Sequence, residues 1–166
     1  MVKITGFVRQ KEELKDYCAF GIVEGMEYGI PLIQEEGFQD GKWKLLGGKS
    51  EEVDKENGIL RPENSVMREI VEKGGIHICQ IVEKPFLVKP KVNKYNAKYD
   101  FIVFITKYSH GALRPGKGIK KTWEFSIKET EEMINLGKIV DDHAEALSEY
   151  INRKKALDLD SIPNMF

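Results

Sequence analysis

The sequence has only two cysteines, Cys18 and Cys79, among 166 residues, so disulfide bonds cannot form its framework. It also lacks a long hydrophobic run, since the strongest, at 101–105, is far shorter than the roughly 20 residues that cross a bilayer. Charged residues interrupt 1–15, which therefore lacks the apolar block of a signal peptide. From these absences we expect a cytoplasmic protein that makes no membrane contact.

An excess of charge of one sign is missing as well. Lys and Arg number 26 against 27 Asp and Glu, so there is no overall field to attract nucleic acid or an anionic membrane. The three histidines, His77, His110 and His143, show no spacing typical of metal ligands. We therefore expect no nucleic-acid partner and no histidine metal centre.

The length and a composition that is 41% hydrophobic and 32% charged are typical of one globular domain. We find no internal repeat and no linker, so we expect a single domain over 1–166, with 157–166 as a tail that could pack on a second copy to form a homodimer.

Apolar patterning predicts strands, a helix, more strands and two further helices. The expected strands are 2–8, 17–23, 28–34, 43–46, 76–82, 86–89, 100–107 and 122–125, and the expected helices are 62–73, 126–136 and one from 141 or 142. The acidic stretch 49–61 is expected to be a loop. This order favours an α/β (α+β) fold, a mixed β-sheet sandwiched between helices.

The helix 62–73 contains the residues that point to chemistry. Pro62 suits its first turn, and Gly74-Gly75 is a strong stop signal. Its apolar stripe should consist of Val66, Met67, Ile70 and Val71. Glu69 and Glu72 are three residues apart, so their side chains point the same way from the edge of that stripe. Upstream, Gly47-Gly48 follows a predicted strand, where the backbone can closely approach a ligand.

The segment Arg68-Glu69-Ile70-Val71-Glu72-Lys73-Gly74-Gly75-Ile76 resembles the Nudix box. That motif begins with Gly, which is followed after five residues by Glu. Seven more residues lead to the segment Arg-Glu-apolar-any-Glu-Glu-any-Gly-apolar. The chain therefore resembles the Nudix hydrolases, which cleave nucleoside diphosphates linked to another group. The likeness covers roughly residues 2–155.

The resemblance implies a role for each matching residue. Glu69 and Glu72 would be catalytic and would bind Mg²⁺ or Mn²⁺, together with the backbone carbonyl of Gly47 or Gly48. Arg68 would orient Glu72. The partner would be a nucleotide-derived small-molecule substrate, whose phosphoanhydride bond is cleaved by a metal-activated water.

The sequence departs from the motif in two ways. Lys73 stands where the family has the second Glu of its Glu-Glu pair, and an ammonium group has no lone pair to give a metal. The spacing between Gly48 and Arg68 is also six residues too long. The family's upstream Glu could accordingly be replaced by one of four residues, namely Glu51, Glu52, Asp54 and Glu56.

Three functions remain open. The first is a metal-dependent hydrolase of nucleoside diphosphate derivatives. The alternative is a catalytically impaired Nudix-fold nucleotide-binding or regulatory module, in which Lys73 pairs with Glu69 or meets a phosphate directly. The third is an interaction protein that associates through 157–166.

Two basic stretches could bind phosphate, although solvated loops would look the same. Their members are Lys89, Lys91, Lys94 and Lys98 in the first, and Arg114, Lys117, Lys120 and Lys121 in the second. Trp43, Tyr95, Tyr99 and Trp123 could stack on a nucleobase, but strand aromatics are more often part of the core.

Overall fold

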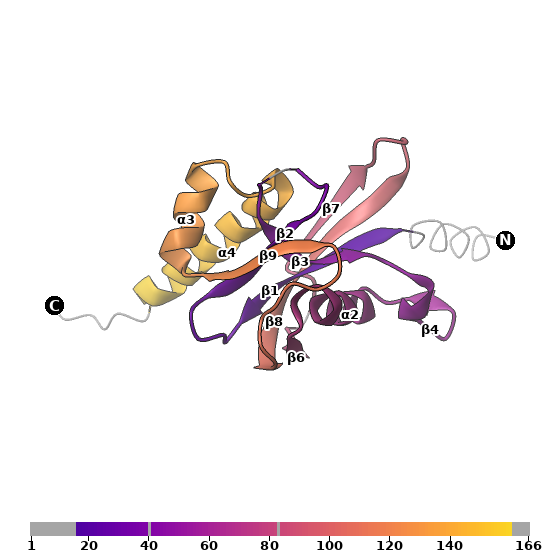
Figure 1. The fold of residues 1–166 in the computed structure, drawn as a ribbon, viewed down its shortest axis with the longest axis horizontal. Coiled ribbons are helices and arrows are strands. Elements are labelled where there is room, and N and C mark those ends of the chain that lie inside the picture. The colour runs from indigo at the N-terminus through magenta and orange to yellow at the C-terminus, as the bar shows by residue number, and fades with distance from the viewer. Residues whose placement is uncertain (1–15, 40, 83, 161–166) are drawn as a thin grey trace.

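The computed structural model describes residues 16–39, 41–82 and 84–160 (Figure 1). The strand expected at 2–8 lies outside the described residues. One mixed sheet forms the centre, with helix α2 (Pro62–Gly74) on one face and helices α3 (Ile127–Asn135) and α4 (Asp141–Asp160) on the other. The expected fold class, a mixed sheet between helices, is confirmed.

The sheet has the strand order β6-β8-β1-β3-β2-β9, and β7 pairs with β8 beside this path. The bounds are β1 Tyr17–Glu24, β2 Ile30–Glu35, β3 Lys44–Lys49, β6 His77–Ile81, β7 Leu87–Val92, β8 Lys98–His110 and β9 Ile119–Phe125. Strands β1 and β8 run parallel, and the other pairs are antiparallel.

Strand β1 supplies side chains to both faces, as the period of two requires. Ala19 and Val23 belong to the core cluster that contains Val66 and Ile70 of α2. Phe20 and Ile22 belong to the opposite cluster, which contains residues of α4. The sheet is therefore covered on both faces, and its central strands are rich in apolar residues for this reason.

Helix α2 begins and ends close to the predicted residues, but its buried face differs from the prediction. Gly75 closes the helix at a φ of 70°, a left-handed conformation that favours glycine. The predicted stripe is wrong at Met67 and Val71, which are 45% and 38% exposed. The helix instead buries Glu69 beside the apolar residues, because this carboxylate packs against β3.

Two prolines lie inside strands, and one loop expectation needs correction. Pro90 lies within β7, which among the described strands pairs only with β8 and so tolerates the missing N–H. Pro31 lies in β2, between β3 and β9. The segment 49–61 contains the 3-10 turn η1 (Glu52–Asp54) and a small hairpin of β4 (Lys55–Glu56) and β5 (Ile59–Leu60).

A capping box starts α3, with Ser126 and Glu129 each accepting a hydrogen bond from the other's backbone N–H. Helix α4 continues to Asp160, so 157–160, assigned to the tail, are helical, and 161–166 lie outside the described residues. None of the described helices is long and apolar enough to cross a membrane.

His143 joins α4 to the sheet. Its ring is 4% exposed, lies edge-on to Phe20 and Phe101, and its Nδ1 accepts a hydrogen bond of 3.1 Å from the N–H of Leu45. Burial, and secondarily the charge of Lys44, lowers the pKa of His143 to about 3. The imidazole is therefore neutral in the folded protein.

This burial makes stability depend on pH. Between about pH 6.5, the ordinary pKa of histidine, and the lowered value, the unfolded chain binds a proton at His143 that the folded chain does not. The free energy of unfolding should thus fall as the pH drops below about 6.5, by up to about 1.4 kcal/mol per pH unit. Urea unfolding of wild type and His143→Gln from pH 7 to pH 5, above the range in which the carboxyl groups titrate, tests this. The pH dependence of the free energy of unfolding should be lost in His143→Gln and kept in His110→Gln, a control at an exposed histidine. If His143→Gln keeps it, or if His110→Gln loses it equally, the buried His143 is not its source.

Candidate active site

The glycine pair at the end of β3 gives the site its close contacts. A Cβ added to Gly47, which has a φ of 150°, would collide with the carbonyl oxygen of Ala19 in β1. A Cβ added to Gly48 would lie 2.8 Å from the carboxylate of Glu69. Both positions therefore require glycine, the first for strand packing and the second because Glu69 lies directly on the backbone.

The carboxylate of Glu69 is only 5% exposed. Its Oε1 accepts a hydrogen bond of 3.0 Å from Arg68, while Oε2 is buried and accepts none within the described residues. The ammonium nitrogen Nζ of Lys73 lies 3.4 Å from Oε2. Glu69 thus presents an oxygen that lacks a hydrogen bond but has a positive charge beside it.

The ammonium group of Lys73 lies among three oxygens. Nζ donates to the carbonyl of Gly47 at 2.8 Å and to Oε1 of Glu35 at 3.0 Å, and Oε2 of Glu69 completes the group. We call these three oxygens the Lys73 cage. The expected pairing of Lys73 with Glu69 is present, and the side chain contacts two residues to which the resemblance assigned a metal.

Glu35, in β2, is a site residue that the sequence motif did not mark. It reaches the cage because β2 lies beside β3, a long-range pairing that no local signal encodes. Its Oε2 also accepts a bond of 2.7 Å from the buried Lys44. Burial opposes ionisation of Glu35, but the two lysines outweigh it and hold the pKa of its carboxyl below the ordinary value. Burial, then the charge of Lys73, lowers the pKa of Lys44.

Arg68 gathers the acidic residues upstream of the cage. Its guanidinium donates two bonds, of 2.8 and 2.9 Å, to Asp54, and Nη1 lies 3.0 Å from both Glu69 and Glu72. The expected contact between Arg68 and Glu72 is therefore present. Asp54 is almost fully buried and also accepts from the hydroxyl of Ser65. Burial raises the pKa of Asp54, but these hydrogen bonds prevail and keep it below its ordinary value.

The four upstream acids differ in how they meet Arg68. Asp54 bonds it directly, Glu51 lies 3.5 Å away, and Glu52 pairs with Lys55 instead. The fourth, Glu56, is exposed in β4. Asp54 is consequently the acid that packs against Arg68.

The six extra residues form a structural unit. Five residues separate Gly48 from Asp54, and residues 55–60 form the β4–β5 hairpin. The N–H of Arg61 then donates to the carbonyl of Asp54 at 3.3 Å, which closes the excursion. Seven residues, 61–67, follow before Arg68. The insertion is thus a surface hairpin that leaves the pairing of Asp54 with Arg68 intact.

No protein-family model matches the sequence, and no curated protein matches it. Among solved structures, a Nudix hydrolase from Nitrosomonas europaea is similar, with a TM-score of 0.66, 18% identity, and coverage of 85% of this chain and 72% of that one. A MutT Nudix hydrolase from Burkholderia pseudomallei is also similar, with a TM-score of 0.61 and 18% identity. The match covers 80% of this chain and 95% of that one. The chain has the Nudix fold.

A third similar structure is the Nudix domain of Shewanella oneidensis NrtR, solved with ADP-ribose. Its TM-score is 0.62 at 15% identity, with coverage of 83% of this chain and 86% of that domain. The Nudix fold is common to these structures, while at such identities neither an activity nor a substrate follows from the likeness.

The Nudix hydrolases that the sequence resembles use a divalent metal. The oxygen atoms of this site can therefore be compared with the coordination that such a metal requires. Mg²⁺ requires near-octahedral oxygens at about 2.0–2.1 Å. Here the carbonyl of Gly47 and the oxygens of Glu35 and Glu69 face an ammonium group, and Glu72 turns to Arg68 with 57% of its side chain exposed. Within the described residues no three acidic, histidine or cysteine side chains could hold a metal. This arrangement does not fit a divalent ion.

A cavity of about 240 Å³ adjoins the glycine pair. Its residues include Cys18 and Lys49, paired across β1 and β3, and Lys98 and Tyr99 at the start of β8. Asp16, Tyr17, Asn93 and Ala97 line it as well, and we call this space the β1–β8 cavity. Burial raises the pKa of the Cys18 thiol. Of the first basic stretch, Lys98 lines this cavity, whereas Lys89 and Lys91 pair with acids of α4.

The hairpin at 55–60 should be dispensable. Deleting these residues restores the seven-residue spacing and keeps Asp54 beside Arg61, so we expect a folded protein with only a small loss of stability. Asp54→Asn, in contrast, removes the buried carboxylate that accepts two hydrogen bonds from Arg68, while Glu69 stays beside the guanidinium, and should cost about 2 kcal/mol.

Thermal and urea unfolding of the two variants, and of their combination, measures the difference. If the deletion destabilises the protein as much as Asp54→Asn, the hairpin supports the site and our account of the insertion is wrong. If Asp54→Asn loses its effect in the deletion background, the pairing with Arg68 has not survived.

Proposed function

We propose that this chain is a Nudix-fold module that binds a nucleotide-derived diphosphate without a divalent metal. The observation that carries the proposal is the position of Lys73, whose Nζ is bonded to the Gly47 carbonyl and to Glu35 and lies beside Glu69. A covalently attached cation neutralises the acids around which a metal-dependent enzyme of this fold would be organised.

Electrostatics favours the ammonium over a metal in the Lys73 cage. A divalent ion about 4 Å from an ammonium group would be repelled by about 8 kcal/mol at an effective dielectric constant of about 20. Lys73 has three donors, and three oxygens of the cage surround them, so the lysine has little to gain by moving out.

The β1–β8 cavity is the place where we expect the diphosphate. Lys49 and Lys98 have no ion-pair partner among the described residues, and the ring of Tyr99 offers a surface for stacking. The similar Nudix domain of NrtR was solved with ADP-ribose, which supports a ligand of this class.

A metal-dependent hydrolase, with Mg²⁺ or Mn²⁺ and with Glu69 and Glu72 as catalytic residues, is the second candidate. It is favoured by one observation, the buried Oε2 of Glu69 that accepts no hydrogen bond within the described residues. In this alternative Lys73 leaves the cage when a nucleoside diphosphate derivative and metal bind. Both candidates share the fold and differ in the need for metal.

Calorimetric titration of the protein with ADP-ribose, once in the presence of Mg²⁺ and once in the presence of EDTA, separates the two candidates. We expect the same Kd for ADP-ribose in both conditions. Lys49→Gln removes one charge-assisted phosphate contact and should raise this Kd about tenfold. Lys128→Gln, an exposed change on α3, should have no effect. Binding that EDTA abolishes, or ADP-ribose hydrolysis that requires metal and is lost in Glu69→Gln, would overturn the proposal and establish the hydrolase.

Lys73→Glu tests the cage itself. The substitution removes the ammonium and adds a carboxylate, so Mn²⁺ measured by electron paramagnetic resonance should bind at least about tenfold more tightly than to wild type. Lys73→Met only removes the charge, so its affinity for Mn²⁺ should lie between those of wild type and Lys73→Glu. An unchanged Mn²⁺ affinity in Lys73→Glu would show that this side chain is not what keeps a metal out.

A further inference from the structure

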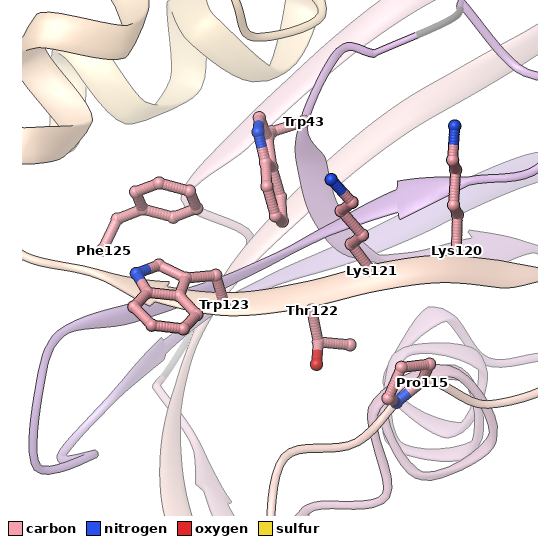
Figure 2. Close-up of a pocket in the computed structure, with 7 residues that line it drawn as sticks. All are labelled: Trp43, Pro115, Lys120, Lys121, Thr122, Trp123 and Phe125. Atoms are coloured by element: carbon pink, nitrogen blue, oxygen red, sulfur yellow. The ribbon is translucent and has the colours of Figure 1, made fainter.

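A second pocket lies on the opposite edge of the sheet, at β9. It has a volume of about 610 Å³ and is lined by Trp43, Pro115, Lys120, Lys121, Thr122, Trp123 and Phe125 (Figure 2). Strand β9 ends the strand order and pairs only with β2 among the described strands. None of the residues that line the β1–β8 cavity lines this pocket, which we call the β9 pocket.

The aromatic wall of the β9 pocket is held in place by the fold. The rings of Trp43 and Phe125 meet edge-to-face with centroids 4.9 Å apart. The backbone of Trp43 is fixed on both sides, because its N–H donates to Lys138 at 2.8 Å and its carbonyl accepts from Val140 at 3.0 Å. This wall is therefore preformed, which lowers the entropic cost of binding a flat ligand.

The side chain of Trp123 is 60% exposed, although burying so large an aromatic side chain is energetically favourable. It is two residues from both Lys121 and Phe125 in β9, so the three side chains lie on one face of the strand. The expectation that strand aromatics belong to the core holds for Trp43 and Tyr99, which pack partly buried against it, but is wrong for Trp123. An exposed indole beside a preformed aromatic wall provides a stacking surface.

Two cations complete the pocket. Figure 2 shows the amino groups of Lys120 and Lys121 on the same side of β9 as the ring of Trp43. Neither lysine has an ion-pair partner among the described residues, and no carboxylate lines the pocket, whereas Lys44 and Lys73 are both paired. The free positive charge favours an anionic ligand.

We propose that the β9 pocket binds a mononucleotide, with its base stacked on Trp123 and Trp43 and its phosphate on Lys120 and Lys121. The volume lies within the range of about 300–1,000 Å³ that is typical of small-molecule sites. The two adjacent lysines match one phosphate group, and they form no extended basic track of the kind that a nucleic-acid strand requires. This site does not depend on the proposed function of the Lys73 cage.

The experiment uses the intrinsic fluorescence of the chain, since both of its tryptophans line this pocket. Titration with AMP should give a saturable change that EDTA does not alter. The double variant Lys120→Gln/Lys121→Gln should raise the Kd for AMP about tenfold, and Trp123→Ala, followed by equilibrium dialysis, should do the same. Adenosine should bind more weakly, and inorganic phosphate alone should not change the fluorescence.

Three controls make the result specific. Lys117→Gln, in the loop before β9 but outside the pocket lining, should bind AMP as wild type does. Lys49→Gln should also leave the AMP signal unchanged, so failure at the β1–β8 cavity and failure here are distinguishable. Circular dichroism should show the fold retained in each variant, since the changed side chains are exposed.

The proposal is overturned if AMP gives no saturable change up to millimolar concentration, or if the lysine and tryptophan variants bind AMP as wild type does. It is also overturned if a single-stranded oligonucleotide binds through these residues and AMP does not, because the pocket would then belong to a nucleic-acid surface.

Discussion

The contact of the Lys73 ammonium with the Gly47 carbonyl, Glu35 and Glu69 is the interaction on which the rest of the site depends. It places a positive charge beside Oε2 of the buried Glu69 carboxylate, the oxygen that Arg68 does not bond, where this carboxylate lies against Gly48. Through Glu35 it also connects to Lys44, so opposite charges alternate from β3 to α2. The positive charge at this site is thus supplied by a lysine side chain of the protein itself.

The same helix holds a second ion network around Arg68. Asp54 accepts two hydrogen bonds from this guanidinium, while Glu69 and Glu72 lie at 3.0 Å from it. Glu69 belongs to both networks, since one oxygen faces Arg68 and the other faces Lys73. Glu69 is accordingly neutralised by protein side chains on both sides.

Local signals predicted the elements whose ends depend on local chemistry. Pro62 and Gly75 set the bounds of α2, and the Ser126–Glu129 box starts α3. Sequence reasoning missed what depends on packing between distant segments. Glu35 reaches the cage only because β2 pairs with β3, and the inward turn of Glu69 depends on the space that Gly48 leaves. The hairpin at 55–60 is too short to give a periodic pattern.

The most direct test of the account is the state of the Lys73 ammonium in solution. Nuclear magnetic resonance of protein labelled with ¹⁵N-lysine, assigned with Lys73→Met, can detect its Nζ protons. A half-buried ammonium held by two hydrogen bonds predicts proton exchange slower than that of an exposed lysine, and a signal that saturating Mg²⁺ leaves unchanged. Rapid exchange, or a shift of this signal at low Mg²⁺ concentration, would show that the cage opens to a metal and would contradict the account.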